Sequence, residues 1–122
     1  MKRAAEPVLL EHLVFKTGFE DNRRCYEAAS PTLRAHRDAP PFFILHGRDA
    51  AIVPTGQARS FDAALRRAGA RTVAYAEIPN AHHAFDAIAT LRCQLSAEAV
   101  ATFLGIVYGQ RRLAALPASR VG

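Results

Sequence analysis

The segment PPFFILHGRDAAIVP, Pro40–Pro54, decides the fold. Its apolar run Phe42–Leu45 shows no alternation with polar residues, which is the pattern of a parallel strand buried on both faces. His46-Gly47 ends the run, and Arg48-Asp49 follow at its carboxyl end, where open α/β sheets bind their ligands. The segment therefore predicts a parallel sheet with polar side chains gathered at one edge.

A second strand and loop follow after a helix. Apolar residues recur at three-and-four spacing from Pro54 to Gly69, which predicts a helix opened by proline and closed by a glycine in the left-handed conformation. Residues Thr72–Ile78 then read as a strand, and Pro79-Asn80 turn the chain into IPNAHHAFD, Ile78–Asp86. A strand, a helix and a strand in this order predict a right-handed parallel βαβ unit.

The remaining segments are predicted to be mostly helical. An amphipathic helix is expected over Glu6–Lys16, and a second over Asn22–Ala29, capped by Asp21 and ended by Ser30-Pro31. A long final helix is expected from Leu91 to about Gly109, its apolar stripe covering the sheet and formed by Leu91, Leu95, Ala99, Phe103, Leu104 and Val107. The chain is interpreted as a single domain, 1–122, with a helical lead-in (1–39), a βαβα core (40–110) and a tail (111–122).

These motifs resemble those of α/β-hydrolases of the bacterial carboxylesterase/lipase type, in the feruloyl-esterase-like or hormone-sensitive-lipase-like branch. In that family a strand ending in HG precedes a loop that carries the catalytic acid and closes on VP, matched by His46-Gly47 and Val53-Pro54. The next loop carries the triad histidine as H-x-F, matched by His83-Ala84-Phe85. The resemblance covers about Ser30 to Tyr108. It implies the C-terminal portion of the fold, its last two parallel strands in a βαβα arrangement.

Two departures from the family pattern bear on activity. The family reads HG-x-x-D-x-x-VP, and its acid position is Ala50 here, with Asp49 one residue earlier. The G-x-S-x-G elbow, which holds the serine nucleophile and precedes the acid and the histidine in chain order, does not occur in the sequence. We expect the nucleophile to come from upstream of this chain or from a companion chain, and the chain alone not to turn over esters.

His83 is the candidate catalytic histidine, because a general base must lie on a loop beside the loop of the acid. Asp49 has two open roles: the triad acid after a local shift of the loop, or a surface carboxylate paired with Arg48 or solvent. His82 is expected to point elsewhere and His46 to be structural. None of the other possible nucleophiles lies in a glycine-flanked elbow, namely Ser30, Ser60, Ser96, Ser119, Cys25 and Cys93.

Composition narrows the class of protein. The chain has 122 residues, a formal net charge of +5 and two cysteines without metal or redox spacing. Its arginines are scattered and not interleaved with aromatic residues, so they indicate a solvated surface and no nucleic-acid partner. We expect no cofactor and no metal, since His82-His83 lack a third ligand. Without a signal peptide or membrane span, a cytoplasmic location is expected.

A two-stranded sheet is marginal in water, and the strand over Phe42–Leu45 would ordinarily pair with a preceding one. We therefore expect a homo-oligomer, a companion chain that carries the nucleophile, or low stability. A small-molecule ester would be bound only after such complementation. The alternative function is a non-catalytic interaction module or degenerate hydrolase remnant, favoured by Ala50 and the missing elbow. Retention of His83-Ala84-Phe85 favours recent descent from an enzyme instead.

Overall fold

The computed structural model describes residues 15–116, which belong to two compact units. The first unit ends at His83 and contains the sheet, and the second begins at Ala84 and contains the last helix. Each unit is described by itself. The helix predicted over Glu6–Lys16 falls almost entirely outside the described residues.

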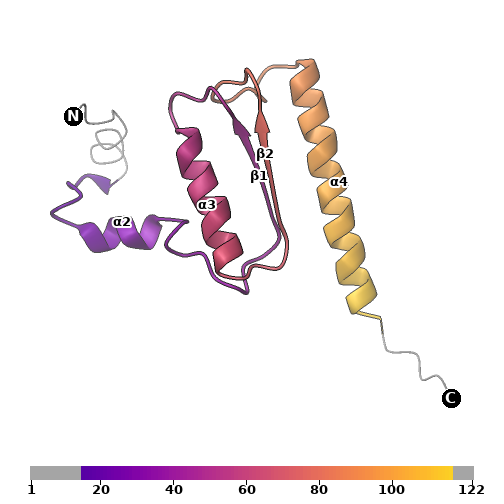
Figure 1. Ribbon diagram of the computed structural model, residues 1–122, viewed down its shortest axis with the longest axis horizontal. Helices are drawn as coiled ribbons and strands as arrows, with labels where there is room; N and C mark the ends of the chain where they lie inside the picture. The colour runs from indigo at the N-terminus through magenta and orange to yellow at the C-terminus, as the bar shows by residue number, and fades with distance from the viewer. Residues whose placement is uncertain (1–14, 117–122) are drawn as a thin grey trace. The chain divides into compact units, whose positions relative to one another are not determined.

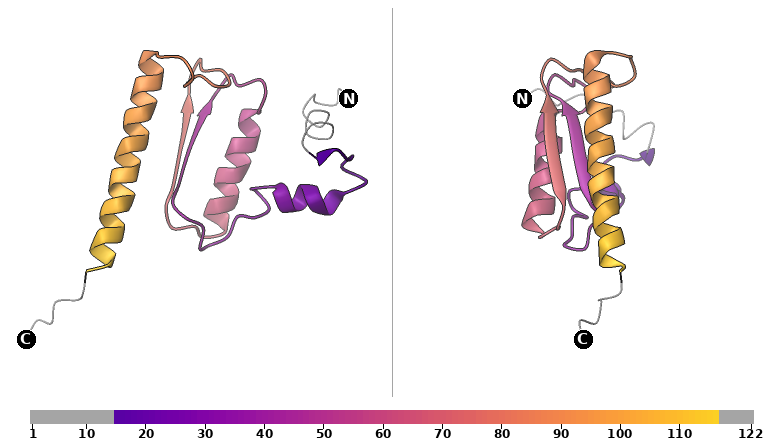
Figure 2. Two further views of the ribbon diagram at one scale, coloured as in Figure 1. Left: turned by 180° about the vertical axis from the view of Figure 1, so that it is seen from behind. Right: turned by 90° about the vertical axis from the view of Figure 1, so that its right-hand side faces the viewer.

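The first unit is built on a parallel strand–helix–strand motif (Figure 1). Strand β1 (Phe42–Gly47) and strand β2 (Val73–Ile78) pair in parallel, with Phe42 opposite Val73 and Gly47 opposite Ile78. Helix α3 (Thr55–Arg67) connects them and packs beside both strands, as the two views of Figure 2 show. The predicted pair of parallel strands and the helix between them are confirmed.

Helix α3 begins and ends where its sequence predicts. Pro54 is the N-cap, so its missing N–H removes no helical hydrogen bond. At the other end Gly69 has a φ of 78°, and the amides of Gly69 and Ala70 donate to the carbonyls of Arg66 and Leu65. This is the Schellman arrangement, in which a left-handed glycine lets two amides satisfy the last carbonyls of a helix.

Burial in the sheet is shallower than the sequence predicted. Residues Phe42–His46 of β1 and all of β2 are half-buried, and Gly47 alone in β1 is buried. The reason is that the described sheet has two strands, each with one neighbour only. Leu65 of α3 is 1% exposed, and Phe42 of β1 meets Phe61 of α3 edge to face with ring centroids 5.3 Å apart. These contacts fix α3 on the sheet.

Helix α2 (Arg23–Ala29) ends at Ser30, whose ψ of 113° is extended, as expected before a proline. Its N-cap is Asn22, not the predicted Asp21, and no side chain caps it. The turn before the helix is held by Tyr26, whose hydroxyl donates to the carbonyl of Thr17 over 2.6 Å. Residues 30–41 contain turns and no helix or strand, so the helical part of the described lead-in ends at α2.

Helix α4 (Leu91–Ala114) is the helix of the second unit and continues five residues past Gly109, where it was predicted to stop. Helical glycine costs only about 1 kcal/mol relative to alanine, and the good helix formers Gln110 to Ala114 carry the helix on. Thr90 caps it by accepting a hydrogen bond from the amide of Cys93. The described helices include none that is both long and apolar enough to span a membrane.

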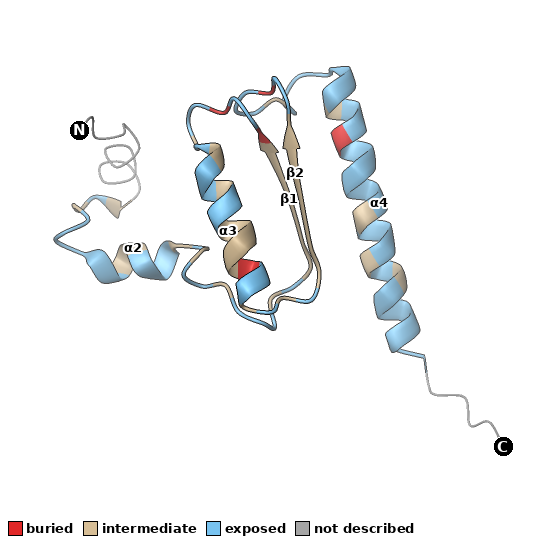
Figure 3. Cartoon of the chain, in the orientation of Figure 1, coloured by how far each residue is buried: buried red, intermediate tan, exposed pale blue. Residues whose placement is uncertain are grey.

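The less exposed positions of α4 coincide with the predicted stripe only at Phe103 and Val107. The others are Cys93, Ser96 and Gly109, whereas Leu91, Leu95 and Leu104 are more than half exposed. Most of α4 is exposed (Figure 3). A helix with apolar residues on several sides has no single stripe that a sequence pattern can identify. That α4 covers the sheet stays a prediction.

Candidate active-site loops at the carboxyl edge of the sheet

Two loops leave the carboxyl ends of the paired strands, and we name them by the roles that the sequence predicts. The acid loop, residues 48–54, follows β1, and the histidine loop, residues 79–83, follows β2. Because β1 and β2 are parallel neighbours in register, both loops emerge at the same edge. The side-by-side placement predicted from the sequence is therefore confirmed.

Hydrogen bonds join the two loops directly. The amide of Arg48 donates to the carbonyl of Ile78 and the amide of Asp49 to that of Ala81, each over 3.0 Å. In return, Nδ1 of His82 lies 3.2 Å from the carbonyl oxygen of Asp49, to which it can donate. Two of the three buried apolar residues in the described chain, Ala50 and Ala81, lie in these loops. The loops are thus packed against each other.

Gly47 makes this close approach possible. A Cβ atom at this position would lie 2.4 Å from the carbonyl oxygen of Ala81 and 2.8 Å from that of His82. Both distances are far below van der Waals contact, and both neighbours are backbone atoms, which cannot rotate away. The glycine of the HG motif is therefore required here for the approach of the histidine loop, in accordance with the use of glycine where backbones meet.

The acid loop is closed by three hydrogen bonds with the residues that flank it. The amide of Ala50 donates to the carbonyl of Gly47 over 3.2 Å, which makes the first turn. Nε2 of His46 donates to the carbonyl of Val53 over 2.9 Å, and the hydroxyl of Thr55 donates to the carbonyl of Arg48 over 2.9 Å. The bond of His46 spans the loop, which agrees with the structural role predicted for that residue.

The structure separates the two positions considered for the acid. Ala50, at the position where the family carries its carboxylate, is 9% exposed, whereas the side chain of Asp49 is exposed. Asp49 contributes its backbone amide and carbonyl to the contact between the loops. Neighbouring residues of a tight turn point in different directions, so the shift by one residue moves the carboxylate from the buried position to the exposed one.

His83 and His82 are both exposed at the end of the histidine loop. Within the described residues no hydrogen bond or ion pair is found between His83 and the carboxylate of Asp49, and the ring of His82 is the one that contacts the acid loop. Asn80 has a φ of 53° and Ala84 a φ of 57°, so left-handed residues shape the backbone on either side of the two histidines.

The sequence reasoning did not identify a charged cluster next to the acid loop. Glu77, on β2, accepts hydrogen bonds from Nη2 of Arg59 over 2.8 Å and from the hydroxyl of Tyr75 over 2.7 Å. Arg48 adds an ion pair with an Nε–Oε2 distance of 3.6 Å. The signal in the sequence was an ionisable residue inside a strand, two residues from a tyrosine and so on the same face.

The charges of this cluster shift the ionisation of its members. Hydrogen bonds from Arg59 and Tyr75, with the positive charges of Arg59 and Arg48, lower the pKa of Glu77 to about 2. Hydrogen bonding to Glu77 raises the pKa of Arg59 above its ordinary value. Burial, followed by the contact with Glu77, raises the pKa of Tyr75. Glu77 is consequently a carboxylate over the whole physiological pH range.

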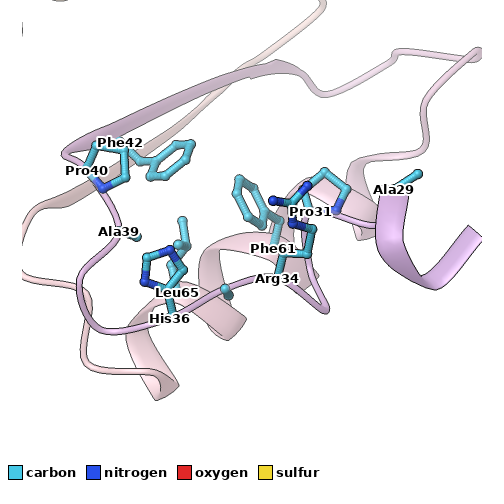
Figure 4. Close-up of a pocket in the computed structure, with 10 residues that line it drawn as sticks. Ala29, Pro31, Arg34, His36, Ala39, Pro40, Phe42, Phe61 and Leu65 are labelled. Carbon is cyan, nitrogen blue, oxygen red and sulfur yellow. The ribbon is translucent and has the colours of Figure 1, made fainter. Parts of the chain in front are cut away.

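A cavity of about 250 Å³ lies in the first unit, at the opposite end of β1 (Figure 4). Its walls include Phe42, Phe61 and Leu65, and His36 and Arg34 come from the segment that precedes β1. Phe42 is the first residue of the strand and Gly47 the last, so this cavity is separated from the two loops by the length of the strand. It does not belong to the candidate active site.

The other candidate nucleophiles lie in helices or at a helix cap, apart from one outside the described residues. Ser60 and Ser96 lie inside α3 and α4, and Ser30 is the C-cap of α2, as predicted, so none of the three follows a strand. Ser119 lies outside the described residues. Cys25 and Cys93 are free thiols. Residues 15–116 contain no cluster of three metal-ligating side chains.

Comparison with known proteins places this geometry in context. The chain is 56% identical over 102 residues to the esterase LipQ of Mycobacterium tuberculosis, a match that covers 84% of the chain and 24% of LipQ. It is 42% identical over 113 residues to the probable carboxylic ester hydrolase LipM of the same organism, covering 93% of the chain and 26% of LipM. A third relative, the esterase LipC, is 36% identical over 110 residues, with 90% of the chain and 27% of LipC covered.

No protein-family model matches the chain. The chain spans about a quarter of the length of each curated relative it matches. Identities of 36–56% over at least 84% of the chain nonetheless go far beyond a shared pair of motifs. The resemblance noted in the sequence is confirmed, and the chain is related to the bacterial carboxylesterases and lipases as a segment about one quarter of their size.

Proposed function

We propose that the chain is the C-terminal segment of a carboxylic ester hydrolase and that it supplies the triad histidine, His83. The serine nucleophile and the oxyanion hole would come from a polypeptide segment outside these 122 residues. The observation that carries this proposal is the contact between the acid loop and the histidine loop at the carboxyl ends of two parallel strands. A hydrolase triad requires that arrangement of its acid and its base.

In the proposed mechanism His83 takes the proton of the serine hydroxyl as the serine attacks the ester carbonyl. It then returns a proton to the alcohol that leaves, so a single ring serves as base and then as acid. An exposed imidazole at the tip of a loop can approach a serine presented by another segment. A carboxylate at the other ring nitrogen would hold the required tautomer, and here the family position for it carries the methyl group of Ala50.

The absence of a carboxylate at position 50 limits the activity that we expect. A triad without its acid retains part of its rate, because the histidine and the oxyanion hole still act, but the loss is on the order of 10⁴-fold in a well-studied serine protease. Asp49 is exposed and one residue displaced, so we do not assign it the role of the acid. The proposed activity is therefore that of a weakened esterase, limited by the orientation of its histidine.

A chimera tests this proposal. The matching quarter of LipQ is replaced by this chain, and hydrolysis of a short-chain nitrophenyl ester is measured. We expect activity above the uncatalysed rate that is lost with His83→Ala and retained with His82→Ala. Ala50→Asp should raise kcat by at least about tenfold by restoring the carboxylate. Equal activity of the chimera and its His83→Ala form would refute the role of His83.

A second candidate function is a non-catalytic remnant that serves as an interaction module. The specific observation in its favour is that a buried alanine occupies the family position of the acid. Under this reading the chimera would fold yet stay inactive even with Ala50→Asp, because other parts of the site would have diverged as well. Circular dichroism of the inactive chimera separates this outcome from a failure to fold.

A further inference from the structure

We propose that Glu77 is a positioning residue that clamps the acid loop to α3 and β2. Its carboxylate contacts donors from three segments of the first unit: Arg59 comes from α3, Tyr75 from β2 and Arg48 from the start of the acid loop. The term acid loop rests on the proposed function, but the clamp itself is a matter of the geometry of this chain.

The burial of the carboxylate supports a clamp over an ordinary surface pair. The side chain of Glu77 is 12% exposed, whereas those of Arg48 and Arg59 are 57% and 61% exposed. A shielded carboxylate must be satisfied by donors, and here the donors are a bidentate guanidinium and a phenol. Removing the carboxylate leaves two arginines and a tyrosine hydroxyl without their shared acceptor.

The position of Arg48 links the clamp to the candidate site. Its amide donates to Ile78, its carbonyl accepts from Thr55 at the start of α3, and its guanidinium faces Glu77. The next residue, Asp49, makes the contact with Ala81 of the histidine loop. A restraint on Arg48 therefore also restrains the backbone that lies against the histidine loop.

Arg66 and Asp62 provide a matched comparison at the other end of the same helix. Arg66 makes an ion pair with Asp62 at 2.9 Å and donates to the carbonyl of Val73, the first residue of β2. This is also an arginine–carboxylate pair, but it lies within α3, and Arg66 reaches β2 only at the amino end of the strand. It should influence that end of the sheet and leave the acid loop unchanged.

The test is amide hydrogen exchange, measured by NMR on the full chain and on Glu77→Gln. We expect the amides of Arg48 and Asp49 to exchange about tenfold faster in Glu77→Gln. The amide of Phe42, bonded to Thr72 at the far end of the sheet, serves as the internal reference and should change little. Asp62→Asn should leave Arg48 and Asp49 unchanged relative to that reference.

Two outcomes would overturn the clamp. Either the exchange of Arg48, Asp49 and Phe42 accelerates by the same factor, which means that Glu77 contributes only to global stability, or Arg48 and Asp49 show no acceleration at all. Arg59→Lys is a second variant that keeps the charge but loses the bidentate contact, and it should reproduce part of the effect. None of these readouts depends on ester hydrolysis, so a failed chimera and a failed clamp are distinguishable.

Discussion

At the scale of single residues, the candidate site depends on positions where a change of one atom or one residue has a large effect. Gly47 has no Cβ, and the histidine loop fills the space that a Cβ would occupy. Ala50 and Asp49 are adjacent, yet one is buried and the other exposed. The side of the tight turn on which a side chain lies therefore decides whether a carboxylate is buried or exposed at the carboxyl edge of the sheet.

Gly47→Ala should destabilise the chain and separate the two loops. The new methyl group would overlap the carbonyl oxygen of Ala81 at 2.4 Å, and overpacking of this kind costs about 1–3 kcal/mol or more. Urea unfolding followed by circular dichroism measures the effect. The control is Gly56→Ala in α3, where nothing lies within 4 Å and the better helix propensity should stabilise by up to about 1 kcal/mol. Equal effects of the two substitutions would contradict the steric argument.

The acid sensitivity of the chain should depend on Glu77. Its pKa is lowered from 4.5 to about 2 in the folded chain, so its stabilising contribution is complete above about pH 4.5 and is lost as the pH falls toward 2. The wild-type unfolding midpoint should therefore fall over this interval, and the fall should be smaller in Glu77→Gln. Thermal unfolding between pH 7 and pH 2 measures both profiles. Identical slopes below pH 4.5 would show that other carboxylates dominate.

At the scale of elements, the connection between the strands explains how the two loops meet. Helix α3 leaves the acid loop at Thr55 and returns the chain through Gly69 to the amino end of β2. Both strands then run in the same direction, and their carboxyl ends coincide. A helix that ended one residue later would shift the register of β2 and the facing positions of the two loops.

Gly69→Ala should weaken this connection. A residue with a side chain costs about 1–2 kcal/mol in the left-handed conformation that Gly69 adopts at a φ of 78°. The change removes no contact, because the nearest neighbouring atom would be Cβ of Arg37 at 4.0 Å. The free energy of unfolding of Gly69→Ala, compared with that of Gly105→Ala in the middle of α4, measures the cost of placing a side chain in the left-handed conformation. A stabilising Gly69→Ala would contradict the left-handed cap.

At the scale of the whole molecule, the described residues bury little apolar surface. Leu65 is the one large side chain of the described residues that is fully buried, and many apolar residues are exposed, among them Leu33, Ile52, Leu91, Leu104 and Leu113. A two-stranded sheet with one neighbour per strand has insufficient buried area for high stability. The relatives, about four times longer, carry much more chain with which such surfaces could be covered.

We therefore expect the isolated chain to be of low stability or to self-associate. If copies cover each other, the thermal unfolding midpoint rises with protein concentration, because association stabilises by mass action. Light scattering and thermal unfolding over a hundredfold range of concentration distinguish the two cases. A monomer with a high, concentration-independent midpoint would contradict both.

The sequence by itself determined the elements and their order. The unbroken apolar run of β1, Pro54 and Gly69 around α3, and Ser30-Pro31 after α2 are local signals that depend on backbone conformation and periodicity, so they could be interpreted without contacts. The sequence also indicated the family and the candidate histidine, because motifs at fixed spacing can be identified in a single sequence. It was wrong about the depth of burial of β1, because burial depends on how much chain surrounds a strand. It was also wrong about the end of α4, because the good helix formers after Gly109 continue the helix.

Only the tertiary structure decided which side chains face each other. The exposure of Asp49 against the burial of Ala50 depends on the turn closed by Gly47, and the contact between the loops depends on backbone atoms that carry no sequence signal. The cluster around Glu77 joins three segments, and Glu77 and Arg59, which form an ion pair, are 18 residues apart in the sequence. Contacts between distant residues follow from the register of two parallel strands, and that register is a property of the packed sheet.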